Sequence, residues 1–145
     1  MQNKFVIYFD KGLPKGTAQQ KGEAIRYKNG RPYIQHFKTE KIAAMRKEFE
    51  WRLRSHAPAR PMEGPIKLFV LVCFSVKDKH LWGQYKTSRP DGDNYLKELK
   101  DAMGSCGFFS DDAQIVDERI VRVYSELASI TIQIETIPQP KKVKT

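Results

Sequence analysis

The feature that most restricts the fold of this chain is an apolar run near its middle, residues 66–76, which reads IKLFVLVCFSV. The run is rich in β-branched and aromatic residues, the types that favour β-strands. A strand with apolar residues at nearly every position is typical of one covered on both faces of a sheet. We therefore expect residues 66–76 to form a central strand that is buried on both sides.

Other strands are expected around this one. Between the short β-forming segments 25–27 and 32–34 lies Asn29-Gly30, flanked by Lys28 and Arg31. An Asn-Gly pair in this setting is a strong hairpin signal, so a small basic hairpin is predicted here. Three more segments have the composition of strands, namely residues 5–9, 115–124 and 127–134.

Two helices are predicted from apolar residues that recur at helical spacing. Thr39 can cap the first helix, which should run to about Arg54, and the second should cover residues 93–103. On the second helix Asp93, Lys97 and Lys100 share a face next to the apolar side. The apolar positions are Ile42, Met45, Phe49 and Leu53 in the first helix, and Tyr95, Leu96, Leu99, Ala102 and Met103 in the second.

Size and charge limit the domain count and the partners. A chain of 145 residues with 40% hydrophobic residues has material for one core, so residues 1–137 are expected to be a single domain. Residues 138–145 contain two prolines and three lysines and are predicted to be a disordered basic tail. With 26 Lys and Arg against 17 acids, the net charge of +9 favours a polyanionic partner, nucleic acid first and an anionic membrane surface second.

The location of the protein is predicted from what the sequence lacks. It has no apolar run long enough to span a membrane and no signal-peptide pattern, so a cytoplasmic protein is expected. Cys73 and Cys106 match no zinc-binding spacing, and we expect both to be reduced thiols.

Against this basic background, two acidic groups are conspicuous: Asp91-Gly92-Asp93-Asn94 and Asp111-Asp112. Two carboxylates about 4 Å apart repel by about 4 kcal/mol at an effective dielectric constant near 20. Acids that cluster therefore imply a bound cation or a raised pKa. Oxygen ligands favour Mg²⁺ or Mn²⁺ over zinc, and a metal of this kind can activate water for attack on a phosphate.

An ordinary structural interpretation of the same residues remains open. Asp91-Gly92 is common turn sequence, Asp93 or Asn94 could cap the following helix, and Asp111-Asp112 could be the tip of a turn. Lys97 could be an exposed i,i+4 partner of Asp93. The two acidic groups would meet only if residues 104–110 led the chain back toward the start of the helix. The sequence permits this path and does not require it.

The motifs between Arg89 and Arg122 resemble those of the RusA family of Holliday junction resolvases. The shared pattern is a basic residue before Asp-x-Asp-Asn, a lysine four residues past the second Asp, and then Gly, Asp-Asp, Gln and a strand. The matching residues are Arg89, Asp91, Asp93, Asn94, Lys97, Gly107, Asp111, Asp112 and Gln114.

The resemblance implies an α/β fold, with a small mixed β-sheet, two main helices packed on it and a homodimeric assembly. It implies a metal-dependent endonuclease that cuts four-way DNA junctions in recombination and repair, with Mg²⁺ or Mn²⁺ as cofactor. Asp91, Asp93 and Asp112 match the metal-binding aspartates of the family, and Lys97 matches its essential lysine. Asp111 ranks below Asp112 as a ligand.

Further expectations concern DNA and the second subunit. Lys86 and Arg89 lead into the acidic motif and are candidate DNA contacts, and paired nicks on opposing strands call for two equal sites, as a two-fold dimer provides. Residues 66–76 and the pair Phe108-Phe109 are candidates for subunit contact, or else for the core of the monomer. The alternatives in function are a metal-dependent nuclease on flaps or forks and a non-catalytic DNA-binding module.

Overall fold

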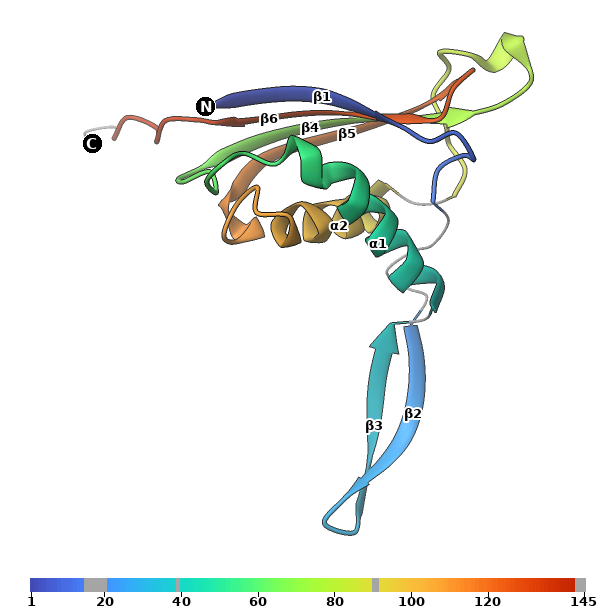
Figure 1. Cartoon of the computed structure of the whole chain (residues 1–145), viewed down its shortest axis with the longest axis vertical. Coiled ribbons are helices and arrows are strands. Elements are labelled where there is room, and N and C mark those ends of the chain that lie inside the picture. Colours follow the sequence, from blue (N-terminus) through green and yellow to red (C-terminus); the bar gives the residue numbers. More distant parts are fainter. Residues whose placement is uncertain (15–20, 39, 90–91, 143–145) are drawn as a thin grey trace.

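The computed structural model describes residues 1–14, 21–38, 40–89 and 92–142. A four-stranded sheet carries both α-helices on one face, and a two-stranded hairpin extends away from them (Figure 1). The elements in chain order are β1 (Gln2–Tyr8), β2 (Lys21–Lys28), β3 (Arg31–Lys38), α1 (Glu40–Leu53), η1 (Arg54–His56), β4 (Ile66–Ser75), η2 (Lys79–Leu81), α2 (Gly92–Ser105), η3 (Asp112–Gln114), β5 (Ile115–Ser125) and β6 (Ser129–Thr136).

The sheet is mixed, as expected from the resemblance. Its strand order is β1-β6-β4-β5, in which β4 is antiparallel to β6 and parallel to β5. Parallel neighbours need a crossover connection, and the segment from β4 to β5 contains α2. This connection fixes the direction of α2, which runs back along the sheet before β5 returns (Figure 1).

The prediction that the central strand is covered on both faces is wrong. Strand β4 lies inside the sheet, but its residues alternate between a buried side, which includes Leu68 and Val70, and a side where Lys67 is exposed and Phe69 half-buried. Both helices lie on the buried side, and no described helix covers the other (Figure 1). The alternation was hidden in the sequence because the open face also carries apolar residues.

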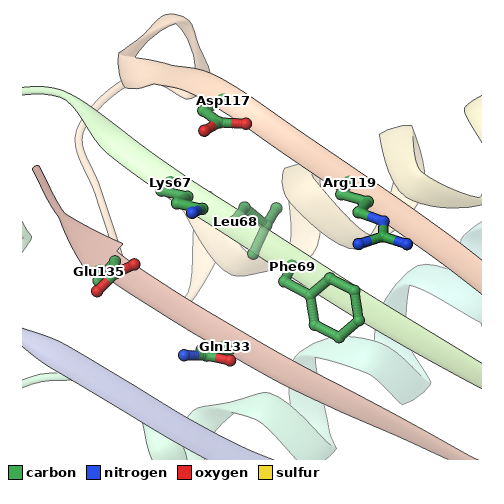
Figure 2. A pocket seen from close by; sticks show the side chains of 7 residues that line it. All are labelled: Lys67, Leu68, Phe69, Asp117, Arg119, Gln133 and Glu135. Atoms are coloured by element: carbon green, nitrogen blue, oxygen red, sulfur yellow. The ribbon is translucent and has the colours of Figure 1, made fainter.

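The open face has a shallow pocket of about 440 Å³ that side chains of β4, β5 and β6 line, as Figure 2 shows. The guanidinium of Arg119 lies 5.8 Å from the centre of the Phe69 ring. Two basic and two acidic side chains line this pocket, so it offers no excess of positive charge to a polyanion. The residues that line it are Lys67, Leu68, Phe69, Asp117, Arg119, Gln133 and Glu135.

The predicted apolar sides of both helices form the core between the helices and the sheet. An ion pair joins the two helices at its edge: Nη2 of Arg46 lies 2.6 Å from Oε2 of Glu98 and 2.9 Å from Oδ2 of Asp101. Glu98 is only 1% exposed. A buried carboxylate needs such a partner, so this pair fixes α2 against α1.

The core also accounts for the Phe108-Phe109 pair. Both rings are buried among the core residues of the monomer, which favours the core alternative over subunit contact.

Cys73 and Cys106 are free thiols as predicted, and burial raises the pKa of the Cys106 thiol. No helix in the described part of the chain is long and apolar enough to cross a membrane. Residues 137–142 have no helix or strand, and the rest of the predicted tail, 143–145, lies outside the described residues.

Candidate active site

Asp93 lies in the first turn of α2, where the helix begins against strand β5. A Cβ atom on Gly92 would lie 3.4 Å from Cγ2 of Ile120 and 3.5 Å from Nε of Arg122. The helix start is thus packed closely on β5, and its small first residue permits that approach. Asp93 itself is exposed. Asp91 and Thr39 lie outside the described residues, so the structure does not test Asp91 as a metal ligand or Thr39 as a helix cap.

Arg122 lies beside the candidate site, and no sequence motif predicted it there. Its Nη1 atom donates a hydrogen bond to the carbonyl oxygen of Ser88 at 3.0 Å, and its side chain passes the start of α2 beside Gly92. The arginine therefore brings a positive charge to the end of the helix where Asp93 lies. Arg122 and Gly92 are far apart in the sequence, so only the packing of α2 on β5 reveals their contact.

Lys97 and Lys100 differ in a way that their shared helix face did not predict. Nζ of Lys100 lies 2.9 Å from Oε2 of Glu118 on β5, so this lysine links α2 to the sheet. Lys97 is exposed, one turn beyond Asp93, and has no ion-pair partner among the residues that the structure describes. Its ammonium group is available for a ligand that approaches Asp93, since positions i and i+4 are neighbours on a helix.

The second acidic group follows the other end of α2. Oδ1 of Asp111 accepts a hydrogen bond from the backbone N of Ala113 at 2.9 Å, so Asp111 caps the short helix η3. Gln114 completes the capping box by accepting from the backbone N of Asp111 at 3.1 Å. Asp112 is exposed. The capping role of Asp111 gives a physical reason for ranking it below Asp112 as a metal ligand.

Within one chain Asp93 and Asp112 do not converge. The segment after α2 turns at once, with Gly107 N donating to Gly104 O at 3.1 Å and Met62 N to Phe108 O at 2.8 Å, and it does not lead back to the helix start. Asp93 and Ser105 are about 18 Å apart along the helix axis. The chain then enters β5 at Ile115, about 16 Å along the strand from Ile120, which neighbours the start of α2.

This separation bears on the expected metal. Within the described ranges, which omit Asp91, no three side chains of His, Cys, Asp or Glu lie close enough to hold an ion. Asp93 and Asp112 of one chain therefore do not fit a shared cation. Each is exposed, Asp93 in the first turn of α2 and Asp112 in the short helix η3 that follows α2, and each is accessible to a second molecule.

The loop between β4 and α2 holds the candidate DNA contacts, and one of them has an internal role. Nζ of Lys86 donates to the carbonyl oxygen of Arg89 at 2.8 Å and lies 5.0 Å from the centre of the Phe74 ring. The loop also pairs with β5, through Lys86 N to Arg122 O at 3.0 Å. Lys86 thus shapes the loop, while Arg89 is exposed.

One mixed sheet with two helices on one face defines a small α/β protein, and an exposed carboxylate lies near each end of its helix α2. The family model described as "Endodeoxyribonuclease RusA" matches residues 12–135. The chain therefore belongs to the RusA endodeoxyribonuclease family, and the resemblance seen in the motifs is confirmed.

Two relatives show how far the similarity extends. The chain is 42% identical over 73 residues to "Crossover junction endodeoxyribonuclease rusA" of Lactococcus phage r1t, which covers 50% of this chain and 56% of that protein. It is 30% identical over 93 residues to the Bacillus subtilis (strain 168) protein YqaN, covering 57% of this chain and 65% of that one. In both cases the matched part spans less than two thirds of the relative.

Proposed function

We propose that this protein is a metal-dependent endodeoxyribonuclease that resolves four-way DNA junctions by paired, symmetric nicks in recombination and repair. The proposal is supported by membership of the RusA family and by the similarity to a phage crossover junction endodeoxyribonuclease. The observation that carries it is the placement of exposed Asp93 and exposed Lys97 one helical turn apart at the start of α2. The net charge of +9 suits a DNA substrate.

The separation of the acids along α2 leads to a proposed homodimer. A two-fold axis that crosses α2 near its middle would set the two copies of the helix antiparallel, so that the start of one lies beside the end of the other. Asp93 would then face Asp112 of the partner subunit, and the same contact would occur twice. Carboxylates brought together in this way would repel each other, and a cation would relieve that repulsion.

The cation would be held by Asp91, Asp93 and Asp112 of the partner subunit, and oxygen ligands of this kind suit Mg²⁺ or Mn²⁺. A bound metal of this type supplies an acidic water and neutralises charge on the phosphate under attack. Lys97, which is exposed on the same face as Asp93, would bind the phosphate and stabilise the charge that builds on it. Lys100 would not, because its ammonium is paired with Glu118.

The cytoplasm is the proposed compartment. Both cysteines are free, and free thiols suit a reducing environment.

The proposal is tested by comparing cleavage of a four-way junction, a linear duplex and a flap of the same sequence, with and without Mg²⁺ or Mn²⁺. We expect metal-dependent, paired cuts in the junction and little cutting of the duplex. The Asp93→Asn protein should bind the junction without cutting it. Equal cutting of the flap and the junction would point to a nuclease of broader structure specificity, and cutting without metal would contradict the proposed chemistry.

A further inference from the structure

The hairpin formed by β2 and β3 has two chemically different faces. In an antiparallel pair, directly opposed residues lie on the same face. Arg26 opposes Tyr33 and Lys28 opposes Arg31, which makes one face basic and aromatic. On the other face the two pairs nearest the tip are apolar or aromatic, since Ile25 opposes Ile34 and Tyr27 opposes Pro32.

The hairpin keeps these side chains away from the body of the protein. It extends from the start of α1 away from the sheet and the helices (Figure 1), and eight paired residues in each strand give it a length of about 26 Å. Its tip is a tight turn in which Asn29 has φ 53° and Gly30 has φ 74°, the conformation that the Asn-Gly pair predicted. Tyr27 is 72% and Ile25 68% exposed.

The basic face is organised for contact with an anion. Nε of Arg26 donates to Oε1 of Gln35 at 3.1 Å, and this bond holds the guanidinium on the face that Lys28 and Arg31 share. All three basic residues are exposed. The segment 21–38 contains five Lys or Arg and a single acid, Glu23, so about half of the net charge of +9 lies in this one hairpin.

We propose that the β2–β3 hairpin is a DNA-binding arm, which contacts the phosphate backbone of an arm of the branched substrate with Arg26, Lys28 and Arg31. This inference rests on the proposed function and adds a second contact surface to it. Charge complementarity selects DNA as the occupant, because a second copy of the chain would present a body that also has more basic than acidic residues. A two-stranded ribbon also has the dimensions that fit the major groove of B-DNA.

Tyr33 can add an aromatic contact to the contacts that the basic side chains make with phosphate. Tyr33 lies on the basic face opposite Arg26, and an aromatic ring there can pack on a base or sugar once the charges have placed the backbone. A two-stranded hairpin is marginally stable by itself in water, so binding along its length would also stabilise the arm.

The test is the salt dependence of junction binding in EDTA, where no strand is cut. The arm variant carries Arg26→Gln, Lys28→Gln and Arg31→Gln. The control carries Lys47→Gln, Arg54→Gln and Arg60→Gln, which removes the same number of lysines and arginines from exposed positions of the body. Removing one protein–phosphate interaction lowers the log-log slope by about 0.9, so we expect a drop of about 2 to 3 for the arm variant and less than about 1 for the control.

A second arm variant, Lys28→Glu with Arg31→Glu, keeps Arg26 and should weaken binding at least as strongly, because its two new carboxylates repel phosphate. Equal slopes for the arm variant and the wild type would overturn the proposal. A second result would also overturn it: the double variant Ile25→Ser with Ile34→Ser changes the protein from a dimer to a monomer, and the arm variant keeps the wild-type slope. The hairpin would then be a subunit contact. Failure of the proposed function is seen separately, as a wild-type protein that binds the junction in EDTA and does not cut it when Mg²⁺ is added.

Discussion

Asp93 and Asp112 lie at opposite ends of helix α2 in the same chain: Asp93 is in the first turn of α2, and Asp112 is in the short helix η3 that follows α2. The helix is 14 residues long, so about 20 Å of rigid structure keeps the two carboxylates apart. A metal ion shared by these two residues therefore requires the chain to meet a second copy of itself.

Lys97 and Lys100 provide a matched pair for testing the role of the exposed lysine. We expect Lys97→Ala to lower the rate of junction cleavage by about 100-fold with an unchanged melting temperature, because a charge that acts in the transition state is removed. Single-turnover cleavage and thermal unfolding measure the two effects.

Lys100→Ala should show the opposite pattern. Its ion pair with Glu118 is partly exposed, so stability should fall by at most about 1 kcal/mol, while cleavage stays near the wild-type rate. Equal cleavage rates for the two variants would assign Lys97 to the solvated surface.

The ion pair between Arg46 and Glu98 is expected to matter for stability. Glu98→Ala leaves a half-buried arginine without that carboxylate, and removing one partner of a buried pair costs about 3 to 5 kcal/mol. The change is at the low end here, since Asp101 also pairs with Arg46 and remains. Urea unfolding measures it, and Arg46→Met combined with Glu98→Leu should recover most of the loss; a double variant as unstable as Glu98→Ala would contradict this interpretation.

Tyr95→Phe, unlike Glu98→Ala, is not expected to lower the free energy of unfolding. Its hydroxyl is buried in the core without a hydrogen-bond partner among the described residues, and burial raises the pKa of the phenol. Tyr95→Phe removes an unsatisfied polar group, so the free energy of unfolding should stay the same or rise by about 1 kcal/mol. The same urea titration tests this, with Phe49→Leu as a control that removes an aromatic ring from the core and should destabilise. A loss of more than about 1 kcal/mol in Tyr95→Phe would show that the hydroxyl is satisfied after all.

The helical face of α2 could be predicted from sequence because its five apolar positions follow the helical period and all are buried. The Asn-Gly turn was equally local, and both of its residues have the positive φ that such turns need. The open face of β4 could not be predicted, since Phe69 and Leu71 make that face look like core. The contact of Gly92 with Arg122 and the turn after Gly104 depend on how distant segments pack, and no local pattern encodes them.

The shared site is tested most directly by mixing two inactive proteins, Asp93→Asn and Asp112→Asn, under conditions in which subunits exchange. In a mixed dimer one site would receive both substitutions and the other neither. About a quarter of the sites should then be intact, and single nicks in the junction should return without paired cuts. If the mixture stays as inactive as its components while exchange is shown by mass, the carboxylates act within one chain and the proposed assembly is wrong.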